Sequence, residues 1–273
     1  MTGIYVGISG WTYPAWRGSF YPAGLPQRRE LEHAARRMSS IEINGSFYSL
    51  QRPTSYQQWS AQTPEDFVFA VKGGRFITHL KKLAGVDIAL ANFFSSGILA
   101  LGAKLGPILW QLPPTLPFQR ERLESFFHLL PRTTTQAAAL AGHHDERMDG
   151  RAWTVTDAER PVRHALEVRH PSYHDPAFLA LLRECGIAVV IADTAGKWPL
   201  FEAVTTDFCY VRLHGDEELY VSGYSDAALD AWAQKITTWA GESHDVFVYF
   251  DNDVKVRAPF DAMALASRLG VGP

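Results

Sequence analysis

The sequence predicts an α/β fold, a single (β/α)8 TIM-like barrel domain over residues 1–273, and three observations support this prediction. Short continuous apolar runs alternate with helical patterns along the chain. Such runs are typical of parallel strands that helices cover on both faces. The runs number eight, which is the count that closes a barrel, and 273 residues is close to the roughly 250 typical of that fold.

Three of the expected strands are followed by glycine or proline. Gly10 closes the first, Gly73 and Gly74 close the third, and Pro113 and Pro114 close the fourth, because proline cannot donate to a sheet. The expected strands are residues 4–10, 40–44, 67–72, 106–112, 165–170, 187–191, 208–213 and 246–250.

The segments between these strands have helical patterns. Residues 28–38, for example, place Leu31, Ala34, Ala35 and Met38 at the i, i+3, i+4, i+7 spacing of a one-sided helix. Further helices are expected near residues 54–62, 87–104, 120–130, 176–185, 226–240 and 258–269. Residues 131–161 depart from the repeat and predict an extra helical and loop segment after the fourth strand, within the same domain.

An open doubly wound sheet is the alternative architecture. It usually carries a glycine-rich phosphate turn after its first strand. The segment Gly7-Ile8-Ser9-Gly10 lacks the G-x-G-x-x-G pattern, so the sequence does not support a dinucleotide site.

Composition narrows the class of protein. A formal charge of −3, from 26 basic and 29 acidic residues, argues against a protein whose affinity comes mainly from nucleic-acid phosphates. Cys185 and Cys209 have no CxxC spacing, which favours neither a disulfide framework nor a zinc knuckle. With no secretory signal pattern and no apolar run of membrane-spanning length, we expect a cytoplasmic protein without a membrane partner.

Ionisable side chains gather at the carboxyl ends of the expected strands, where barrel enzymes carry their active sites. Glu42 and Glu167 are the first candidates for acid/base groups, because opposing charges and partial burial can separate the protonation of two carboxyls. His214 is a candidate proton shuttle, and equally a turn residue before Gly215. The candidate substrate-binding residues are Asn44, Lys72, Gln111, Arg169, Arg212, Asp251, Asn252 and Trp11.

Two other interpretations of these residues remain open. The opposite charges could form a structural ion-pair network that fills the barrel mouth without catalysing anything. Glu42, Glu167, His214 and Asp251 are also acceptable ligands for a divalent metal, although no tight spacing such as HExxH accompanies them, so no metal site is predicted. The segment with His143, His144 and Asp145 is expected to be solvated surface.

Several segments together resemble the YecE-like family, also called domain of unknown function 72. The resemblance spans nearly the whole chain and implies a single TIM-like barrel, and it supplies no reaction. Among the matching pieces are Gly7-Ile8-Ser9-Gly10-Trp11-Thr12-Tyr13, Glu42-Ile43-Asn44-Gly45-Ser46-Phe47-Tyr48, Phe69-Ala70-Val71-Lys72, Glu167-Val168-Arg169-His170-Pro171-Ser172, Tyr210-Val211-Arg212-Leu213-His214-Gly215 and Tyr249-Phe250-Asp251-Asn252-Asp253.

The leading hypothesis is an enzyme that performs acid/base chemistry, with hydrolysis as the candidate reaction, on a small polar and anionic ligand at the carboxyl end of the barrel. The cationic side chains Lys72, Arg169 and Arg212 suggest the anionic ligand. The alternative is a non-catalytic module that binds a ligand or a nucleic acid through the same charged and aromatic residues. The sequence predicts neither the substrate nor the oligomeric state.

Overall fold

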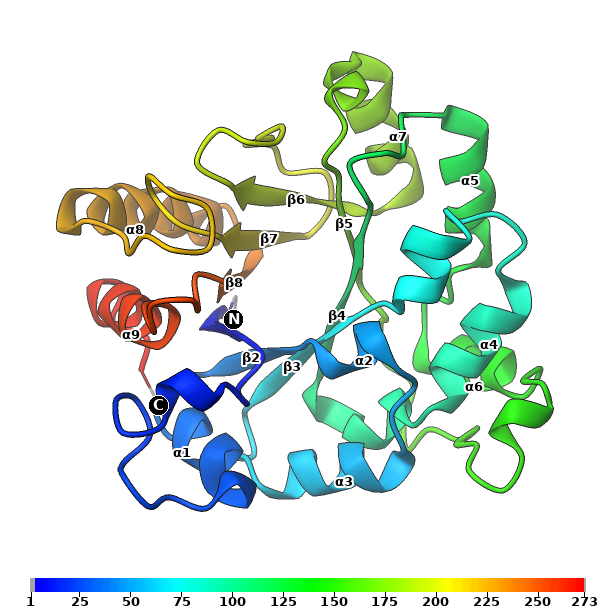
Figure 1. Ribbon diagram of the computed structural model, residues 1–273. Helices are drawn as coiled ribbons and strands as arrows, with labels where there is room; N and C mark the ends of the chain where they lie inside the picture. The colour runs from blue at the N-terminus through cyan, green and yellow to red at the C-terminus, as the bar shows by residue number, and fades with distance from the viewer. Residues whose placement is uncertain (1–2, 273) are drawn as a thin grey trace. The chain divides into compact units, whose positions relative to one another are not determined.

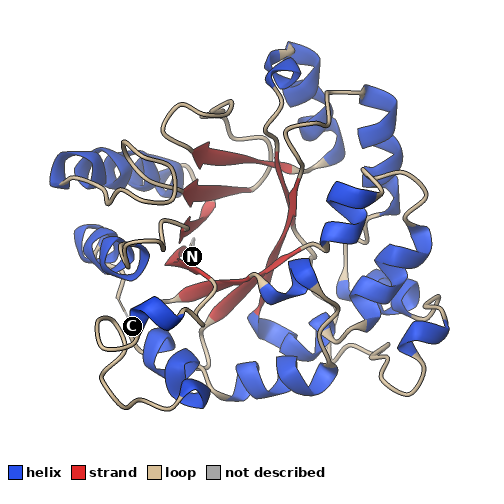
Figure 2. Ribbon diagram, viewed as in Figure 1, coloured by secondary structure: helices blue, strands red, loops and turns tan. Residues whose placement is uncertain are grey.

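The structure is a computed structural model that describes residues 3–272, and its eight strands form one parallel sheet closed into a barrel in the order β1 to β8 (Figures 1 and 2). The predicted fold class is confirmed. Residues 1, 2 and 273 of the predicted domain lie outside the described residues. The strands are β1 (Ile4–Ser9), β2 (Ser40–Ile43), β3 (Val68–Lys72), β4 (Leu105–Gln111), β5 (His164–Glu167), β6 (Ala188–Asp193), β7 (Phe208–Leu213) and β8 (Asp245–Phe250).

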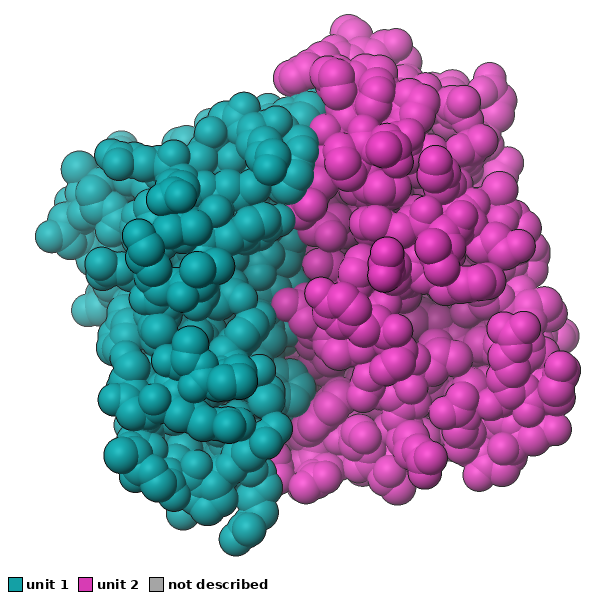
Figure 3. Space-filling model, in the orientation of Figure 1, with its two compact units in different colours: residues 1–42, 63–68, 188–273 teal, residues 43–62, 69–187 magenta. Residues whose placement is uncertain are grey.

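Contacts between residues divide the chain into two compact units, which Figure 3 shows in different colours. Unit 1 contains residues 1–42, 63–68 and 188–273. Unit 2 contains residues 43–62 and 69–187. Each unit is discontinuous in sequence, because the chain leaves unit 1 after Glu42, returns to it for residues 63–68, and returns again at Ala188, where β6 begins.

Unit 1 is built around β8, which pairs with β1 on one side and with β7 on the other. Val248 lies opposite Val6 of β1 and Val211 of β7, and all three side chains are buried. The two long helices α8 and α9 contact β8, and α9 also contacts β1. The helical elements of this unit are η1 (Pro14–Trp16), η2 (Gln27–Arg29), α1 (Glu30–Ala35), α8 (Asp226–Gly241) and α9 (Ala258–Leu269).

Unit 2 is built around β4, which pairs with β3 and β5. Trp110 is fully buried against Phe93 and Phe126, so aromatic packing anchors the strand. The next residue, Gln111, lies opposite Glu167 of β5. The helical elements are α2 (Gly45–Tyr48), α3 (Pro53–Ala61), η3 (Phe76–Leu80), α4 (Asp87–Ser95), η4 (Ile98–Lys104), α5 (Arg120–Leu129), α6 (Thr134–Ala141), η5 (Glu146–Met148), η6 (Pro171–His174) and α7 (Pro176–Cys185).

The helix expected over residues 87–104 is broken in the middle, so that prediction is wrong in its extent. The α-helix α4 ends at Ser95, and a 3-10 segment, η4, begins at Ile98. Gly97 between them has a φ of +114°, and a Cβ at this position would lie 2.4 Å from Cα of Pro53. The close approach of α3 therefore requires glycine here, and its backbone conformation stops the helix.

The strand expected over residues 165–170 is also shorter than predicted. Its last ladder bond runs from the Leu112 amide to the Glu167 carbonyl at 2.8 Å. Three residues later His170 caps the turn η6, because its Nδ1 accepts from the Ser172 amide at 3.1 Å. Arg169 consequently lies beyond the strand rather than within it.

The extra segment predicted after the fourth strand is present and lies in unit 2. It contains α6 and the 3-10 turn η5. Thr133 caps α6 by accepting from the Gln136 amide, and the Trp153 amide donates to the Ser95 carbonyl of α4 at 2.8 Å. Within residues 3–272, no helix combines the length and the apolar character needed to cross a membrane.

Candidate functional site

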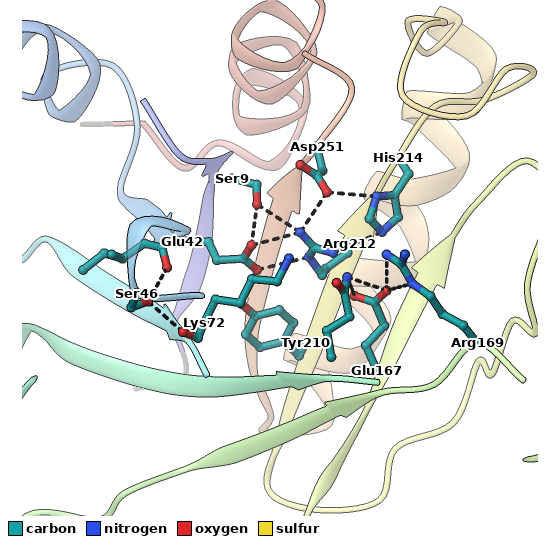
Figure 4. A network of polar contacts seen from close by, with 12 residues as sticks. Ser9, Glu42, Ser46, Lys72, Glu167, Arg169, Tyr210, Arg212, His214 and Asp251 are labelled. Carbon is teal, nitrogen blue, oxygen red and sulfur yellow. Dashed lines mark hydrogen bonds and ion pairs between the residues drawn. The ribbon is translucent and has the colours of Figure 1, made fainter. Parts of the chain in front are cut away.

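The residues predicted for the site divide between the two units, and within each unit most of them contact one another (Figure 4). Unit 1 holds Trp11, Glu42, Arg212, His214, Asp251 and Asn252. Unit 2 holds Asn44, Lys72, Gln111, Glu167 and Arg169.

In unit 1 the centre of the cluster is a buried ion pair between Glu42 at the end of β2 and Arg212 of β7. Arg212 donates from Nε to Glu42 Oε2 at 3.1 Å and from Nη2 to Glu42 Oε1 at 2.9 Å. Neither side chain has any exposed surface. Burying two charges is costly unless they are paired and hydrogen-bonded, and this two-point geometry satisfies both conditions.

Two hydroxyls complete the surroundings of the Glu42 carboxylate. Tyr210 donates to Oε2 at 2.7 Å, and Ser9 donates to Oε1. Burial and the neighbouring Glu42 carboxylate raise the pKa of Tyr210 well above its ordinary value, so its hydroxyl stays a donor. A carboxylate has about four lone-pair sites, and Arg212, Tyr210 and Ser9 together supply four donors. Glu42 therefore acts in unit 1 as the group that orients Arg212.

Asp251, just after β8, contacts the same guanidinium. Arg212 Nη2 lies 2.8 Å from Asp251 Oδ2, and His214 Nδ1 lies 3.1 Å from the same oxygen. His214 Nε2 is 3.4 Å from Arg212 Nη1. Arg212 and His214 are fully buried, whereas the Asp251 side chain is 15% exposed. The network thus runs from a buried core to a carboxylate that reaches solvent.

A second carboxyl, Asp253, lies near this solvent-facing end and was not among the predicted site residues. Burial is the main cause that raises the pKa of Asp253 to about 7, and the negative charge of Asp251 contributes, against smaller lowering effects of Tyr13 and Arg212. The signal in the sequence is the Asp-Asn-Asp run after the eighth strand, and the sequence prediction includes Asp251 and Asn252 of this run but not Asp253. Two neighbouring carboxyls of unlike protonation are the usual form of an acid/base pair.

Two predicted binding residues of unit 1 make contacts outside this network. Asn252 is fully buried and donates from Nδ2 to Asp261 Oδ2 at 2.8 Å and to the Ser222 carbonyl at 2.9 Å. These bonds tie the loop after β8 to α9. The Trp11 carbonyl accepts from the Tyr21 hydroxyl at 2.6 Å, which fixes the loop after β1.

In unit 2 the corresponding centre is Glu167 at the end of β5. Its Oε1 accepts from Arg169 Nε at 2.8 Å, and Arg169 Nη2 also lies 2.8 Å from that oxygen. Gln111 Nε2 lies 2.9 and 3.0 Å from the two carboxylate oxygens. Glu167 is 1% exposed and the Arg169 side chain 12%, so the guanidinium is the part of this pair nearer to solvent.

Lys72, at the end of β3, lies beside an aromatic ring. Its Nζ is 4.7 Å from the centre of the Phe47 ring, a cation–π distance. The Lys72 carbonyl accepts from Ser46 Oγ at 2.7 Å, which holds the end of β3 against α2. Asn44, directly before α2, accepts at its carbonyl from the Phe47 amide and so begins the turn that carries this ring.

His79 is a functional candidate of unit 2 that was not among the predicted site residues. It lies on one turn of π-helix, η3, and its ring packs edge-on against Phe47 with 5.1 Å between centroids. Burial is the main cause that lowers the pKa of His79 to about 4, and the charges of Lys72 and Arg169 contribute. The imidazole is therefore neutral at pH 7. No regular periodicity marks residues 76–80, so only the lone histidine after Gly73 and Gly74 could have pointed to it.

Metal ligation has no support from the arrangement of side chains within residues 3–272, where no group of three or more His, Cys, Asp or Glu residues is placed to hold an ion. The carboxylates considered as ligands instead bind neighbouring side chains. Glu42 and Asp251 accept from Arg212, and Glu167 accepts from Arg169. An arginine guanidinium is among the groups that contact each carboxylate, and a bound cation would have to displace it.

Comparison with known proteins identifies a family and several relatives of this chain. The family model described as "Protein of unknown function DUF72" matches residues 5–273. The UPF0759 protein YunF of Bacillus subtilis is 23% identical over 92% of this chain and 89% of its own length. The UPF0759 protein YecE of Escherichia coli K12 is 30% identical over 46% of this chain and 43% of its own length.

Solved structures support the fold. A DUF72 family protein from Thermotoga maritima MSB8 superposes with a TM-score of 0.78 at 23% identity, covering 98% of this chain and 99% of the other. A DUF72 family protein from Enterococcus faecalis V583 gives a TM-score of 0.75 at 16% identity, covering 98% and 96% of the two chains. These similarities extend over the full barrel.

Proposed function

The chain belongs to the family described as protein of unknown function DUF72, which confirms the resemblance seen in the sequence, and from that premise we propose that it is an enzyme performing acid/base chemistry on a small anionic substrate. The observation that carries the proposal is the placement of neutral His79 among the charges of Lys72, Arg169 and Glu167 in unit 2. Fold membership alone would not indicate a reaction, because barrels of this kind host many chemistries.

The anionic character of the substrate follows from the charges around His79. Lys72, Arg169 and Arg75 all lower its pKa, and only Glu167 opposes them. The electrostatic potential at the imidazole is therefore positive. Arg169 brings a planar guanidinium suited to two-point recognition of a carboxylate or phosphate, and Lys72 brings a compact charge. The Phe47 ring beside Lys72 offers an apolar face to the rest of the substrate.

His79 and Glu167 are the acid/base candidates of this cluster. A neutral imidazole can accept a proton from a substrate or from water, and the two cations that bind the substrate help to keep it neutral. The carboxylate of Glu167 orients Arg169 through Oε1 and is held by Gln111. In this assignment Lys72 and Arg169 bind the anion, His79 takes up the proton, and Glu167 is the second acid/base group. A hydrolytic reaction would use His79 to activate water.

The carboxyl pair of unit 1 independently supports acid/base chemistry. Asp251 Oδ2 lies 2.8 Å from Arg212 Nη2 and 3.1 Å from His214 Nδ1, while burial raises the pKa of the nearby Asp253 to about 7. A group that titrates near neutrality is the most effective general acid or base at that pH. Glu42, whose oxygens are occupied by Arg212, Tyr210 and Ser9, serves here as a positioning residue.

Binding of inorganic phosphate tests the first half of the proposal. We expect Lys72→Met and Arg169→Met to weaken phosphate binding, measured by calorimetry, by about tenfold or more each, since a charge-assisted hydrogen bond contributes ~1.5–3 kcal/mol. Arg183→Met is the matched control, because Arg183 is an exposed arginine of α7. Equal phosphate affinity in the three variants would contradict the proposed anion site.

Turnover tests the second half. In a screen of phosphoesters and carboxylic esters, His79→Asn and Glu167→Gln should lose about 10²-fold or more of the parent's turnover, the usual contribution of a general acid or base. Both variants should keep the parent's circular dichroism spectrum. An activity that survives both substitutions would contradict the roles assigned to His79 and Glu167.

A non-catalytic binding module is the alternative, favoured by the aromatic ring of Phe47 beside the cation of Lys72. It predicts phosphate binding without turnover of any ester in the screen. If the ligand is a nucleic acid, retention of a single-stranded oligonucleotide should fall steeply as salt rises. If the ligand is a small anion held in the cluster, the oligonucleotide should not be retained.

A further inference from the structure

Unit 2 contains a pocket that the Lys72 and Glu167 cluster does not use. Its volume is about 420 Å³, within the range of small-molecule sites. None of Lys72, His79, Glu167 or Arg169 lines it. The walls come instead from the end of α2, the turn η3, the helix α4 and the turn η5 of the inserted segment.

One wall of this pocket is formed by large apolar side chains that remain in contact with solvent. Tyr48 is 77% exposed, Phe76 45% and Ile88 49%. Large rings and aliphatic groups are normally buried, and a cluster of them around a concavity indicates a site for an apolar partner. An occupant with a flat apolar body would remove these three side chains from water at once.

The polar part of the lining is fixed by a buried amide. Asn92 of α4 is 4% exposed and exchanges two hydrogen bonds with Asp145: Asn92 Nδ2 donates to Oδ1 at 2.9 Å, and the Asp145 amide donates to Asn92 Oδ1 at 3.0 Å. Asp145 Oδ1 also accepts from the Arg147 amide at 3.1 Å. The segment around Asp145 is therefore bound to α4 and is not only the solvated surface that the sequence predicts. This attachment brings Arg147 to the pocket.

The charges of the lining favour an anion. Lys81 and Arg147 are cationic, and Asp145 is the carboxylate among the lining residues. That carboxylate is engaged by Asn92 and lies 3.7 Å from Arg147 Nε. Lys81 Nζ lies 5.8 Å from the centre of the Phe76 ring, so one cation stands beside the apolar wall. Two cations against one carboxylate leave the lining with a net positive charge.

We propose that this pocket is a second ligand site, which binds a planar aromatic molecule bearing one anionic group. The ring lies against Tyr48, Phe76 and Ile88, and the anionic group faces Lys81 and Arg147. This site is separate from the proposed acid/base cluster, so the two proposals can fail independently.

Three small probes of the same shape test the proposal on the full chain: 2-naphthoate, neutral 2-naphthamide and cationic 2-naphthylmethylammonium. Calorimetry should give the strongest binding for naphthoate, weaker binding for the amide, and the weakest for the cation. Failure of naphthoate to bind at millimolar concentration, or a preference for the cation, would overturn the proposal.

Variants then locate the bound probe. Ile88→Glu places a negative charge in the apolar wall and should weaken naphthoate binding by about tenfold or more, since like-charge juxtaposition is strongly unfavourable. Val155→Glu is the control, because Val155 is 59% exposed in the same unit and does not line the pocket. Equal losses in the two variants would contradict the assigned place.

A double variant separates the charge from the ring. Lys81→Ala with Arg147→Ala should weaken naphthoate binding and leave naphthamide binding unchanged, because only the anion contacts these cations. Equal losses of naphthoate and naphthamide affinity in the double variant would show that Lys81 and Arg147 do not contact the anionic group, and would refute the assigned site.

Discussion

Arg212 binds Glu42 through two nitrogens and Asp251 through one of the same nitrogens, so one guanidinium joins the ends of β2, β7 and β8 in unit 1. Glu42 and Arg212 are fully buried, which makes the pair costly to break from one side. Glu42→Gln should lower the free energy of unfolding by about 3–5 kcal/mol, because it leaves an incompletely compensated buried charge. Denaturant unfolding measures this loss.

The double variant Glu42→Leu with Arg212→Met provides the control for that loss. Replacing both partners by apolar groups removes the two charges together, and such replacements are often neutral or stabilising. We therefore expect the double variant to be more stable than Glu42→Gln. A double variant less stable than Glu42→Gln would mean that Arg212 stabilises unit 1 through its other partners more than through Glu42.

His164 of β5 should contribute to a loss of protein stability in acid. This histidine is fully buried, and its Nε2 lies 2.8 Å from the Pro131 carbonyl while Trp110 donates to its Nδ1 at 3.2 Å. Burial lowers the pKa of His164 to about 3. The unfolded chain therefore binds more protons below the ordinary value near 6.5, and stability falls as pH falls from about 6.5 toward 3.

His164→Gln tests this account, because glutamine keeps polar atoms in the site and does not titrate. The variant should be less stable than the parent at pH 7, since two hydrogen bonds are disturbed, and its stability should fall less steeply between about pH 6.5 and 3. His128→Gln, which replaces an exposed histidine of α5, is the control for the substitution itself. A parallel slope in His164→Gln would contradict the assignment.

Asp253 predicts the opposite pH dependence. Its pKa is raised to about 7, so the folded state holds a proton that the unfolded state releases above about pH 3.9. Stability from this group is greatest in acid and is lost as pH rises toward 7. The free energy of unfolding of Asp253→Asn minus that of the parent should therefore be larger at pH 8 than at pH 4. Urea unfolding at the two pH values measures the difference.

The sequence predicted the eight strands closely because each is a short and mostly apolar run, and several of these runs stop at a glycine or a proline. Its errors have local physical causes. The break at Gly97 depends on the approach of Pro53, a contact between distant segments that no pattern in residues 87–104 reveals. β5 ends early because His170 caps the turn η6. In the sequence, by contrast, charged and apolar residues alternate as far as Arg169.

The candidate residues that lie at strand ends could be predicted from the sequence. Because Glu167 and Arg169 alternate with apolar residues, we expect their charges to be either paired or exposed. In the structure the two side chains pair at 2.8 Å. Glu42 and Arg212 come from strands far apart in sequence, so their pairing could not be read from either segment alone. His79 and Asp253 lie outside the strands, where their properties depend on burial and neighbouring charge rather than on residue type.

Cooperative unfolding is the prediction that concerns domain organisation. The chain has two compact units, yet its eight strands close a single barrel, and unit 1 is assembled from three separate stretches of chain. We propose that residues 1–273 fold as one domain, and we expect tyrosine and tryptophan fluorescence and circular dichroism to report one coincident transition in urea. Two resolved transitions would show that the units fold separately.

Gly97 offers the sharpest test of local packing. Gly97→Ala should destabilise the protein by more than the roughly 1–2 kcal/mol that a left-handed backbone costs an ordinary residue, because the added Cβ would also lie 2.4 Å from Cα of Pro53. Gly150→Ala is the matched control: Gly150 has a φ of +70°, and a Cβ added there would meet no atom of the described residues within 4 Å. The control should lose only the backbone cost. If the two variants lose equal stability in urea unfolding, the approach of α3 to Gly97 does not require glycine.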